Sequence, residues 1–124
     1  MNRQIFALTL ATRDLATTED FYAKVFDAEV IYSDEACRIF KFGETLINCL
    51  SIENARELFA PAAVSGPGHA SMLTIQVDSV DAEAERLKTL GVALNTEPTD
   101  QPWGIRTITF QDPAGQLWEF SHPL

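Results

Sequence analysis

The sequence predicts one α+β domain, residues 1–124, built from two copies of a β-α-β-β-β unit. The first reason is an internal repeat, because residues 8–12 (LTLAT) reappear as residues 73–77 (LTIQV) at the start of the second copy. The second reason is that a helix pattern and three β-rich runs follow each segment in the same order. With 124 residues and 46% hydrophobic content, the chain can bury the core of one domain.

A helix is predicted after the first strand of each copy. Asp14 and Ser79 stand at the two helix starts, where a side-chain oxygen can accept hydrogen bonds from the free N–H groups of the first turn. Apolar residues then recur on one stripe of each helix, which predicts that this stripe is buried. The stripe residues are Phe21, Tyr22, Val25 and Phe26 in the first helix and Val80, Ala84, Leu87 and Leu90 in the second. Gly91 is predicted to end the second helix in a left-handed conformation.

Three short β-rich runs follow each predicted helix. They cover residues 29–33, 38–42 and 45–51 in the first copy and residues 92–96, 105–110 and 116–121 in the second. The last two runs are separated by residues 112–115 (DPAG), whose Pro and Gly favour a turn between paired strands. Residues 61–68 hold too much Pro and Gly for regular structure. They are therefore predicted to link two modules, at about residues 1–60 and 69–124.

The composition argues against several classes of protein. Nine Lys and Arg residues against eighteen Asp and Glu give a formal charge of −9, whereas binding to a nucleic-acid backbone needs clustered cations. The apolar stretches are shorter than the ~20 residues that span a membrane, and the first residues lack the apolar run of a secretory signal. We therefore expect a cytoplasmic protein with no nucleic-acid and no membrane partner, whose Cys37 and Cys49 are buried free thiols.

Three motifs carry a resemblance to a known family. They are residues 13–15 (RDL) followed by Phe21 and Tyr22, residues 77–81 (VDSVD) followed by Leu87 and Gly91, and residues 110–119 (FQDPAGQLWE), the most specific of the three. By their order and spacing, the chain resembles the vicinal oxygen chelate superfamily, also called the glyoxalase/bleomycin resistance protein/dioxygenase family, over nearly its whole length. The resemblance implies two modules whose mixed sheets curl around a cleft, and a homodimer. It implies no single activity, because the family contains isomerases, epimerases, thiol transferases, dioxygenases and binding proteins.

The resemblance also locates the four positions at which metal-dependent members hold a divalent ion. Here they fall on Ala7, Asn48, Met72 and Glu119. Glu119 is a good metal ligand and Asn48 is a weak oxygen donor, but Ala7 and Met72 cannot supply the His nitrogens that select Zn, Fe or Ni. No cofactor is therefore predicted. Glu119 is the one family-type ligand retained, and a divalent metal is expected only under the enzymatic alternative given below.

Strand alternation predicts which side chains line the cleft. In the first strand of each copy, one face is apolar and the other carries both polar and apolar side chains. The apolar face should therefore pack against the helices, and the mixed face should line the cleft and contact a ligand. Trp103 and Arg106 add an aromatic ring and a permanent cation beside a strand start; the alternative is that Trp103 packs at a subunit interface and Arg106 pairs with a carboxylate. The predicted ligand-binding residues are Asn48, Leu50, Met72, Thr74, Trp103, Arg106 and Glu119.

Glu119 is the predicted catalytic residue if the protein is an enzyme. It would act as a base, as a lone metal ligand completed by waters, or as the acceptor for a cationic or hydroxylated ligand; the alternative is a relic bonded to its neighbours. An iron site of two histidines and Glu119 would need both His69 and His122. His69 precedes the expected position and His122 has the opposite strand parity from Glu119, so two surface histidines are predicted instead.

The predicted function is that of a small-molecule-binding protein of the bleomycin-resistance type, with an unassigned ligand. The alternative is a glyoxalase-like lyase or an extradiol-dioxygenase-like enzyme that uses Glu119 with an unusual or absent metal. A third hypothesis is a structural or regulatory dimer that binds no ligand. No histidine is placed to activate either cysteine, so cysteine catalysis is not expected.

Overall fold

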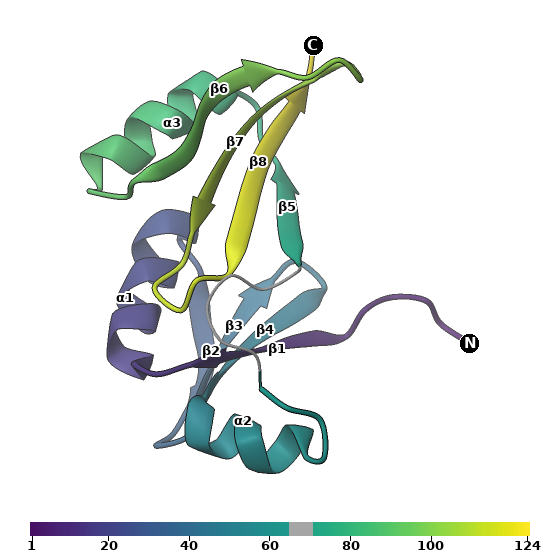
Figure 1. Cartoon of the computed structure of the whole chain (residues 1–124), viewed down its shortest axis with the longest axis vertical. Coiled ribbons are helices and arrows are strands. Elements are labelled where there is room, and N and C mark those ends of the chain that lie inside the picture. Colours follow the sequence, from purple (N-terminus) through teal and green to yellow (C-terminus); the bar gives the residue numbers. More distant parts are fainter. Residues whose placement is uncertain (65–70) are drawn as a thin grey trace. The chain divides into compact units, whose positions relative to one another are not determined.

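The computed structural model describes residues 1–64 and 71–124, and the chain divides into two compact units, Met1–Gly66 and Pro67–Leu124 (Figure 1). The first unit contains β1 (Ala7–Thr12), α1 (Leu15–Phe26), β2 (Glu29–Ser33), β3 (Cys37–Phe42), β4 (Thr45–Ser51) and α2 (Ile52–Phe59). The second contains β5 (Met72–Gln76), α3 (Val80–Thr89), β6 (Leu94–Asp100), β7 (Ile105–Gln111) and β8 (Leu117–Pro123). Each unit therefore has its own sheet and at least one helix of its own, as expected for an α+β fold.

The two sheets have the same topology. Their strand orders are β1-β4-β3-β2 and β5-β8-β7-β6. In both units the first strand runs parallel to the last, and the other neighbours are antiparallel. The predicted α+β class and the predicted repeat are therefore confirmed, and the first strand of each copy lies at an edge of its sheet.

In the first unit, α1 begins and ends where local chemistry dictates. Asp14 Oδ1 accepts a hydrogen bond from the Thr17 N–H at 2.9 Å, and the helix ends at Asp27 with a positive φ of 49°. Tyr22 is fully buried and stacks on Phe40 of β3 with 5.0 Å between ring centroids. The face of the sheet that carries Phe40 is thus the face that packs α1, and the face that carries Asn48 is turned away from it.

In the second unit, α3 is held to β8 at its first turn. Ser79 Oγ accepts from the Ala82 N–H at 3.1 Å, and His122 Nδ1 of β8 accepts from the Val80 N–H at 2.9 Å. Two of the N–H groups that a helix start leaves free are thereby satisfied. Alternate residues of β7 and β8 form a buried apolar face, and α3 contacts both strands. The buried residues of this face are Ile108, Phe110, Trp118 and Phe120.

Two elements differ from the sequence prediction. No helix was predicted at residues 52–59, where α2 forms, and the run predicted at 92–96 is β6, which extends from Leu94 to Asp100. Pro98 lies inside β6, which is compatible with a strand at the edge of its sheet, where Pro removes no essential hydrogen bond. Residues 65–68 of the predicted linker, and His69, lie outside the described residues.

None of the three helices in the described part of the chain is both long enough and apolar enough to span a bilayer.

We predict that Ser79→Ala lowers the free energy of unfolding by about 1 kcal/mol, because it removes the acceptor for the Ala82 N–H at the start of α3. Chemical denaturation measures the change. Ser33→Ala serves as the control, since Ser33 is exposed at the end of β2 and its side chain makes no hydrogen bond with any described residue. An equal loss in the two variants would show that the cap contributes nothing.

Candidate functional site

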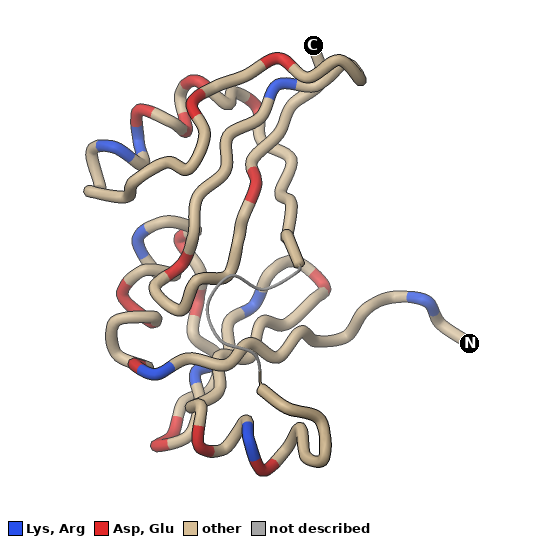
Figure 2. The backbone as a smooth tube through the Cα atoms, viewed as in Figure 1, with Lys and Arg blue, Asp and Glu red and all other residues tan. Residues whose placement is uncertain are grey.

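Glu119 lies in a row of polar side chains that crosses the whole sheet of the second unit. Thr74 on β5 and Thr109 on β7 are its direct partners across β8, and Thr96 on β6 is the partner of Thr109. Paired residues on neighbouring strands point to the same face. We call these four residues, Thr74, Glu119, Thr109 and Thr96, the Glu119 row. Figure 2 shows acidic positions on helices and on strands of the chain.

Hydrogen bonds fix the side chains of the Glu119 row. Thr74 Oγ1 donates to Glu119 Oε1 at 3.0 Å, and the Thr96 and Thr109 hydroxyls lie 2.9 Å apart. Thr96 Oγ1 also accepts from the Thr109 N–H at 2.9 Å, at a point where β6 bulges. The row therefore offers one carboxylate and three hydroxyls whose positions are set by the strands and by each other.

Glu119 keeps capacity for further hydrogen bonds. It is half-buried, and among the described residues Thr74 is its one hydrogen-bond donor. A carboxylate can accept about four hydrogen bonds. Beside the Glu119 row, Met72 of β5 and Leu117 of β8 are paired and form an apolar patch on the same face, and Met72 is 45% exposed. The exposed part of this face thus combines an acceptor-rich row with an apolar neighbour, as small-molecule sites do.

The structure places Arg106 on the other face of the same sheet. Arg106 is paired with His122, which is an odd number of residues from Glu119 along β8, so its side chain points away from the Glu119 row. Its guanidinium donates to Asp81 Oδ1 at 2.9 Å and to Asp100 Oδ1 at 2.7 Å. Asp81 and then Asp100 raise the pKa of Arg106. The carboxylate pairing that the sequence analysis left as the alternative is what the structure contains, and ligand binding by Arg106 stays a prediction.

Trp103 and His122 also stand apart from the Glu119 row. Trp103 lies in the connection between β6 and β7 with 69% of its surface exposed, next to Gly104, whose φ is +90°. His122 has the strand parity opposite to Glu119, and its Nδ1 is used by the Val80 N–H. Glu119 and His122 are therefore not brought together as ligands of one ion.

In the first unit, Asn48 and Leu50 occupy the face that α1 leaves uncovered. Asn48 on β4 lies between Thr9 of β1 and Ile39 of β3, and its Oδ1 is buried with no hydrogen-bond partner among the residues described. An unsatisfied buried acceptor is uncommon and calls for a donor from water or a ligand. Leu50 has the same parity and is 8% exposed, because it packs against Ala55 of α2 in a small apolar cluster.

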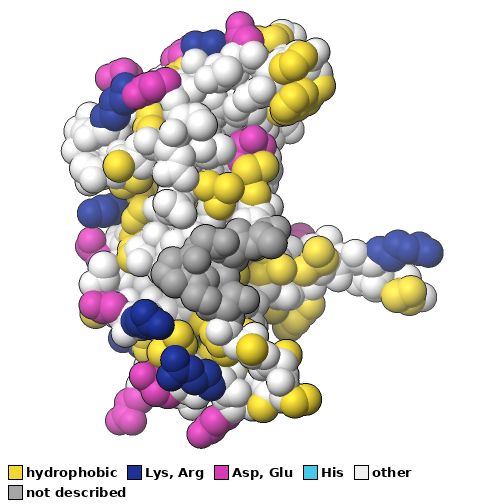
Figure 3. Space-filling model, viewed as in Figure 1, with side chains coloured by type: hydrophobic (Ala, Val, Ile, Leu, Met, Phe, Trp, Pro, Cys, Tyr) yellow, Lys and Arg dark blue, Asp and Glu magenta, His cyan; other side chains and the backbone are white. Residues whose placement is uncertain are grey.

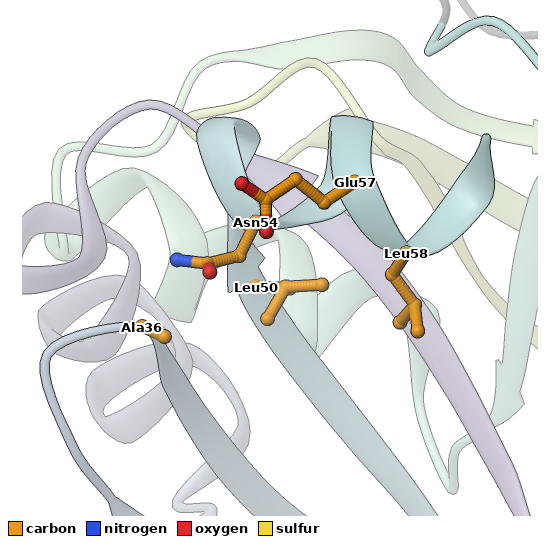
Figure 4. A pocket seen from close by; sticks show the side chains of 5 residues that line it. All are labelled: Ala36, Leu50, Asn54, Glu57 and Leu58. Atoms are coloured by element: carbon orange, nitrogen blue, oxygen red, sulfur yellow. The ribbon is translucent and has the colours of Figure 1, made fainter.

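A pocket opens beside Leu50, between α2 and the turn that precedes β3. Its volume is about 380 Å³. Leu50 contributes from β4, Ala36 from the turn, and three residues from α2 (Figure 4). The α2 residues are Asn54, Glu57 and Leu58. Every lining residue belongs to the first unit, so the pocket is a property of that unit alone.

The three α2 residues were missed in the sequence analysis because α2 itself was missed. The signal was present at Ser51, whose Oγ accepts from the Asn54 N–H at 3.3 Å and from Asn54 Nδ2 at 2.7 Å. Ser at a helix start with an acidic residue, Glu53, in the first turn is a recognised helix signal. The proximity of the proline-rich segment obscured it, because that segment suggested a linker.

Asp34 holds the turn that forms one wall of this pocket. Its Oδ1 accepts from the Ala36 N–H at 2.8 Å and the Cys37 N–H at 3.0 Å, and its Oδ2 accepts from the Tyr32 hydroxyl at 2.8 Å. The Ala36 N–H, followed by the Tyr32 hydroxyl, lowers the pKa of Asp34. In turn, burial and then the hydrogen bond with Asp34 raise the pKa of the Cys37 thiol. Cys37 and Cys49 are buried free thiols, as predicted.

We predict that the Ala36 and Cys37 amide signals follow the ionisation of Asp34 with a midpoint below its ordinary value of 3.8. Since the pKa is lowered in the folded state, this carboxylate stabilises the protein at pH values above the pKa of an unfolded Asp, and the contribution is lost as the pH falls through the folded-state pKa. A pH titration by amide NMR measures the midpoint. The same amides in Asp34→Asn should show no such step, and a midpoint above 3.8 would contradict the assigned contacts.

Comparison with known proteins places this geometry in a family. The sequence model of the glyoxalase/bleomycin resistance protein/dioxygenase superfamily matches residues 4–120. The chain belongs to this superfamily. An uncharacterized protein of Mycobacterium bovis is 29% identical over 126 residues, covering 93% of this chain and 80% of the relative.

Solved structures of the superfamily share the fold. A glyoxalase/bleomycin resistance protein/dioxygenase from Nocardioides has a TM-score of 0.86 and 26% identity, covering 100% of this chain and 85% of that one. A lactoylglutathione lyase from Agrobacterium tumefaciens has a TM-score of 0.79 and 22% identity, covering 98% of this chain and 94% of that one. These similarities establish the fold and leave the chemistry to the residues present.

The residues at the metal positions that the resemblance implies do not fit a divalent-ion site of the superfamily type. Ala7 has no donor atom, and the thioether of Met72 suits soft ions, so the two positions that would carry imidazole nitrogens carry none. Glu119 is committed to the Thr74 hydroxyl on one oxygen. Within residues 1–64 and 71–124, no group of three or more His, Cys, Asp or Glu side chains is arranged to hold an ion.

Proposed function

We propose that this chain is a small-molecule-binding protein of the superfamily and that its ligand contacts the Glu119 row. One observation carries the proposal: a half-buried carboxylate, oriented by the Thr74 hydroxyl at 3.0 Å, stands on a polar face beside the exposed Met72. Burying part of a carboxylate costs free energy unless it is paired or used. The single neutral donor leaves room for ligand donors, which favours hydroxylated or cationic ligands.

The other predicted ligand-binding residues enter the proposal with unequal support. Asn48 is supported by its unsatisfied buried Oδ1, whereas Leu50 is buried against α2 and has no such support. Trp103 is supported by the exposure of its ring. Arg106 would take part only if a ligand displaced Asp81 or Asp100 from its guanidinium.

The second candidate function is a glyoxalase-like or extradiol-dioxygenase-like enzyme. The same hydrogen bond favours it, because a carboxylate held by one oxygen is oriented to take a proton with the other. No step of this chemistry is assigned to a metal, since two of the four superfamily positions offer no suitable donor. The experiment below separates the two candidates.

We predict that a thermal-shift screen of hydroxylated and cationic small molecules, including metal-free bleomycin, raises the melting temperature in a concentration-dependent way. In Glu119→Gln, the affinity for the best compound, measured by calorimetry, should fall about tenfold, as expected for losing a hydrogen bond to a charged group. Glu85→Gln is the matched control, because it removes the same charge from an exposed position on α3. Equal affinities in all three proteins would refute a role for Glu119.

Elemental analysis of protein purified without an affinity tag accompanies this screen. Near-stoichiometric metal, or Glu119-dependent turnover of a glyoxalase or catechol substrate, would replace the binding proposal with the enzymatic one. Absence of both, together with Glu119-dependent binding, would support the binder.

We further propose a cytoplasmic homodimer. The location is supported by two free thiols, which are typical of a reducing compartment. Dimerisation is supported by the N-terminal segment before β1, which carries hydrophobic side chains (yellow in Figure 3). In this segment Phe6 is 76% exposed and Ile5 is 58% exposed. Exposed apolar groups beside an edge strand favour a partner that covers them.

We predict that analytical ultracentrifugation gives twice the mass of the chain and that Phe6→Ser shifts the protein toward the monomer. Leu124→Ser is the control, since it replaces another exposed apolar side chain. A wild-type protein that stays monomeric at every concentration would refute the dimer.

A further inference from the structure

We propose that the pocket beside α2 binds a small amine with an apolar body, independently of Glu119. The pocket and the Glu119 row belong to different units and share no residue. The proposal therefore adds a second site to the one proposed above, and its success or failure does not depend on that site.

The apolar part of the pocket is built on a small cluster of buried residues. Leu50 packs with Cys37 of β3 and Ala55 of α2, which are both buried, and Ala36 packs against the same cluster. Leu58, on the α2 side, keeps 66% of its surface exposed. These three aliphatic side chains, Leu50, Ala36 and Leu58, can cover an apolar ring or a short chain, and about 380 Å³ is at the small end of ligand pockets.

The polar part of the pocket offers mainly acceptors. Asn54 donates through Nδ2 to Ser51 Oγ at 2.7 Å, which fixes its amide and leaves Oδ1 without a donor among the described residues. Glu57 lies one position before Leu58 on α2, and no Lys, Arg or His of the described chain is within ion-pair distance of its carboxylate. A ligand that fits must therefore bring its own donor. An ammonium group supplies three N–H donors and the charge that Glu57 lacks.

The charges around the pocket favour the same ligand. Asp34 and Glu35 precede Ala36 in the turn that forms one wall of the pocket. Arg56 of α2 precedes Glu57 but does not line the pocket, and Arg38 of β3 is already bonded to Glu19 and to the carbonyl of Asp34. Glu57 also lies near the C-terminal end of α2, where the helix dipole favours a cation. An anionic ligand would be repelled by these carboxylates.

The test is a titration of the ¹⁵N-labelled full-length chain with 2-phenylethylamine, followed by amide NMR. Shifts are expected at Ala36, Leu50, Asn54 and Leu58. Phenylacetate, which has the same ring with the opposite charge, should leave these signals in place. Glu57→Gln should weaken the amine about threefold, the scale of an exposed ion pair. Glu53→Gln is the matched control, with the same charge change on the same helix outside the pocket lining, and should leave the affinity within error of the wild type.

A second variant, Ala36→Leu, fills the pocket and should abolish the shifts at α2, and the amide spectrum itself reports whether the variant folds. Glu119→Gln should bind the amine as the wild type does. Equal shifts with phenylacetate, no shift at the α2 amides, or no difference between Glu57→Gln and Glu53→Gln would overturn the proposal. Shifts that map to the Glu119 row and vanish in Glu119→Gln would overturn the second site while supporting the first.

Discussion

The parallel pairing of the first and last strands of each unit is the constraint on which the rest of the structure depends. In the second unit it sets Thr74 against Glu119 and Met72 against Leu117, and in the first it sets Thr9 against Asn48. Because side chains alternate along a strand, a shift of one residue would turn Glu119 into the apolar face against α3. The Phe120 and Trp118 side chains, both nearly fully buried, hold the register by occupying that face.

The two units share one sheet topology but differ in which faces of the sheet are covered by helices. The sheet of the first unit has α1 against one face and α2 against part of the other, where the pocket and the buried Asn48 Oδ1 are found. In the second unit, α3 packs the apolar face, and within its described residues no helix packs the face of the Glu119 row. The difference lies in residues 52–59, which form α2 directly after β4 of the first unit.

The sequence was sufficient for the fold and for Thr74 and Glu119, but not for the other two members of the Glu119 row or for the pocket. Local patterns can be recognised without knowledge of the tertiary contacts. They include the repeat, the capping residues Asp14 and Ser79, and the alternation around Thr74. The carboxylate partners of Arg106 lie on α3 and β6, which meet β7 only in the folded protein. Strand alternation therefore predicted that Arg106 lies on a strand, but not which carboxylates pair with it. The helix α2 was not predicted because its eight residues adjoin a segment rich in Pro and Gly. The pocket residues on this helix, Asn54, Glu57 and Leu58, were therefore not predicted either.

The order in which the second unit can be assembled follows from its strand pairing. β5 has β8 as its one neighbour in the described sheet, and the Thr74–Glu119 bond spans 45 positions of sequence. Likewise, the Val80 N–H in the first turn of α3 can donate to His122 only after His122, 42 positions further along the chain, has been made. On the ribosome, β5 therefore emerges with both edges open and stays so until residues 117–123 have been made. Until then this half of the chain holds a strand without a partner, and a chain that ended just before β8 would lack the strand that joins β5 to β7.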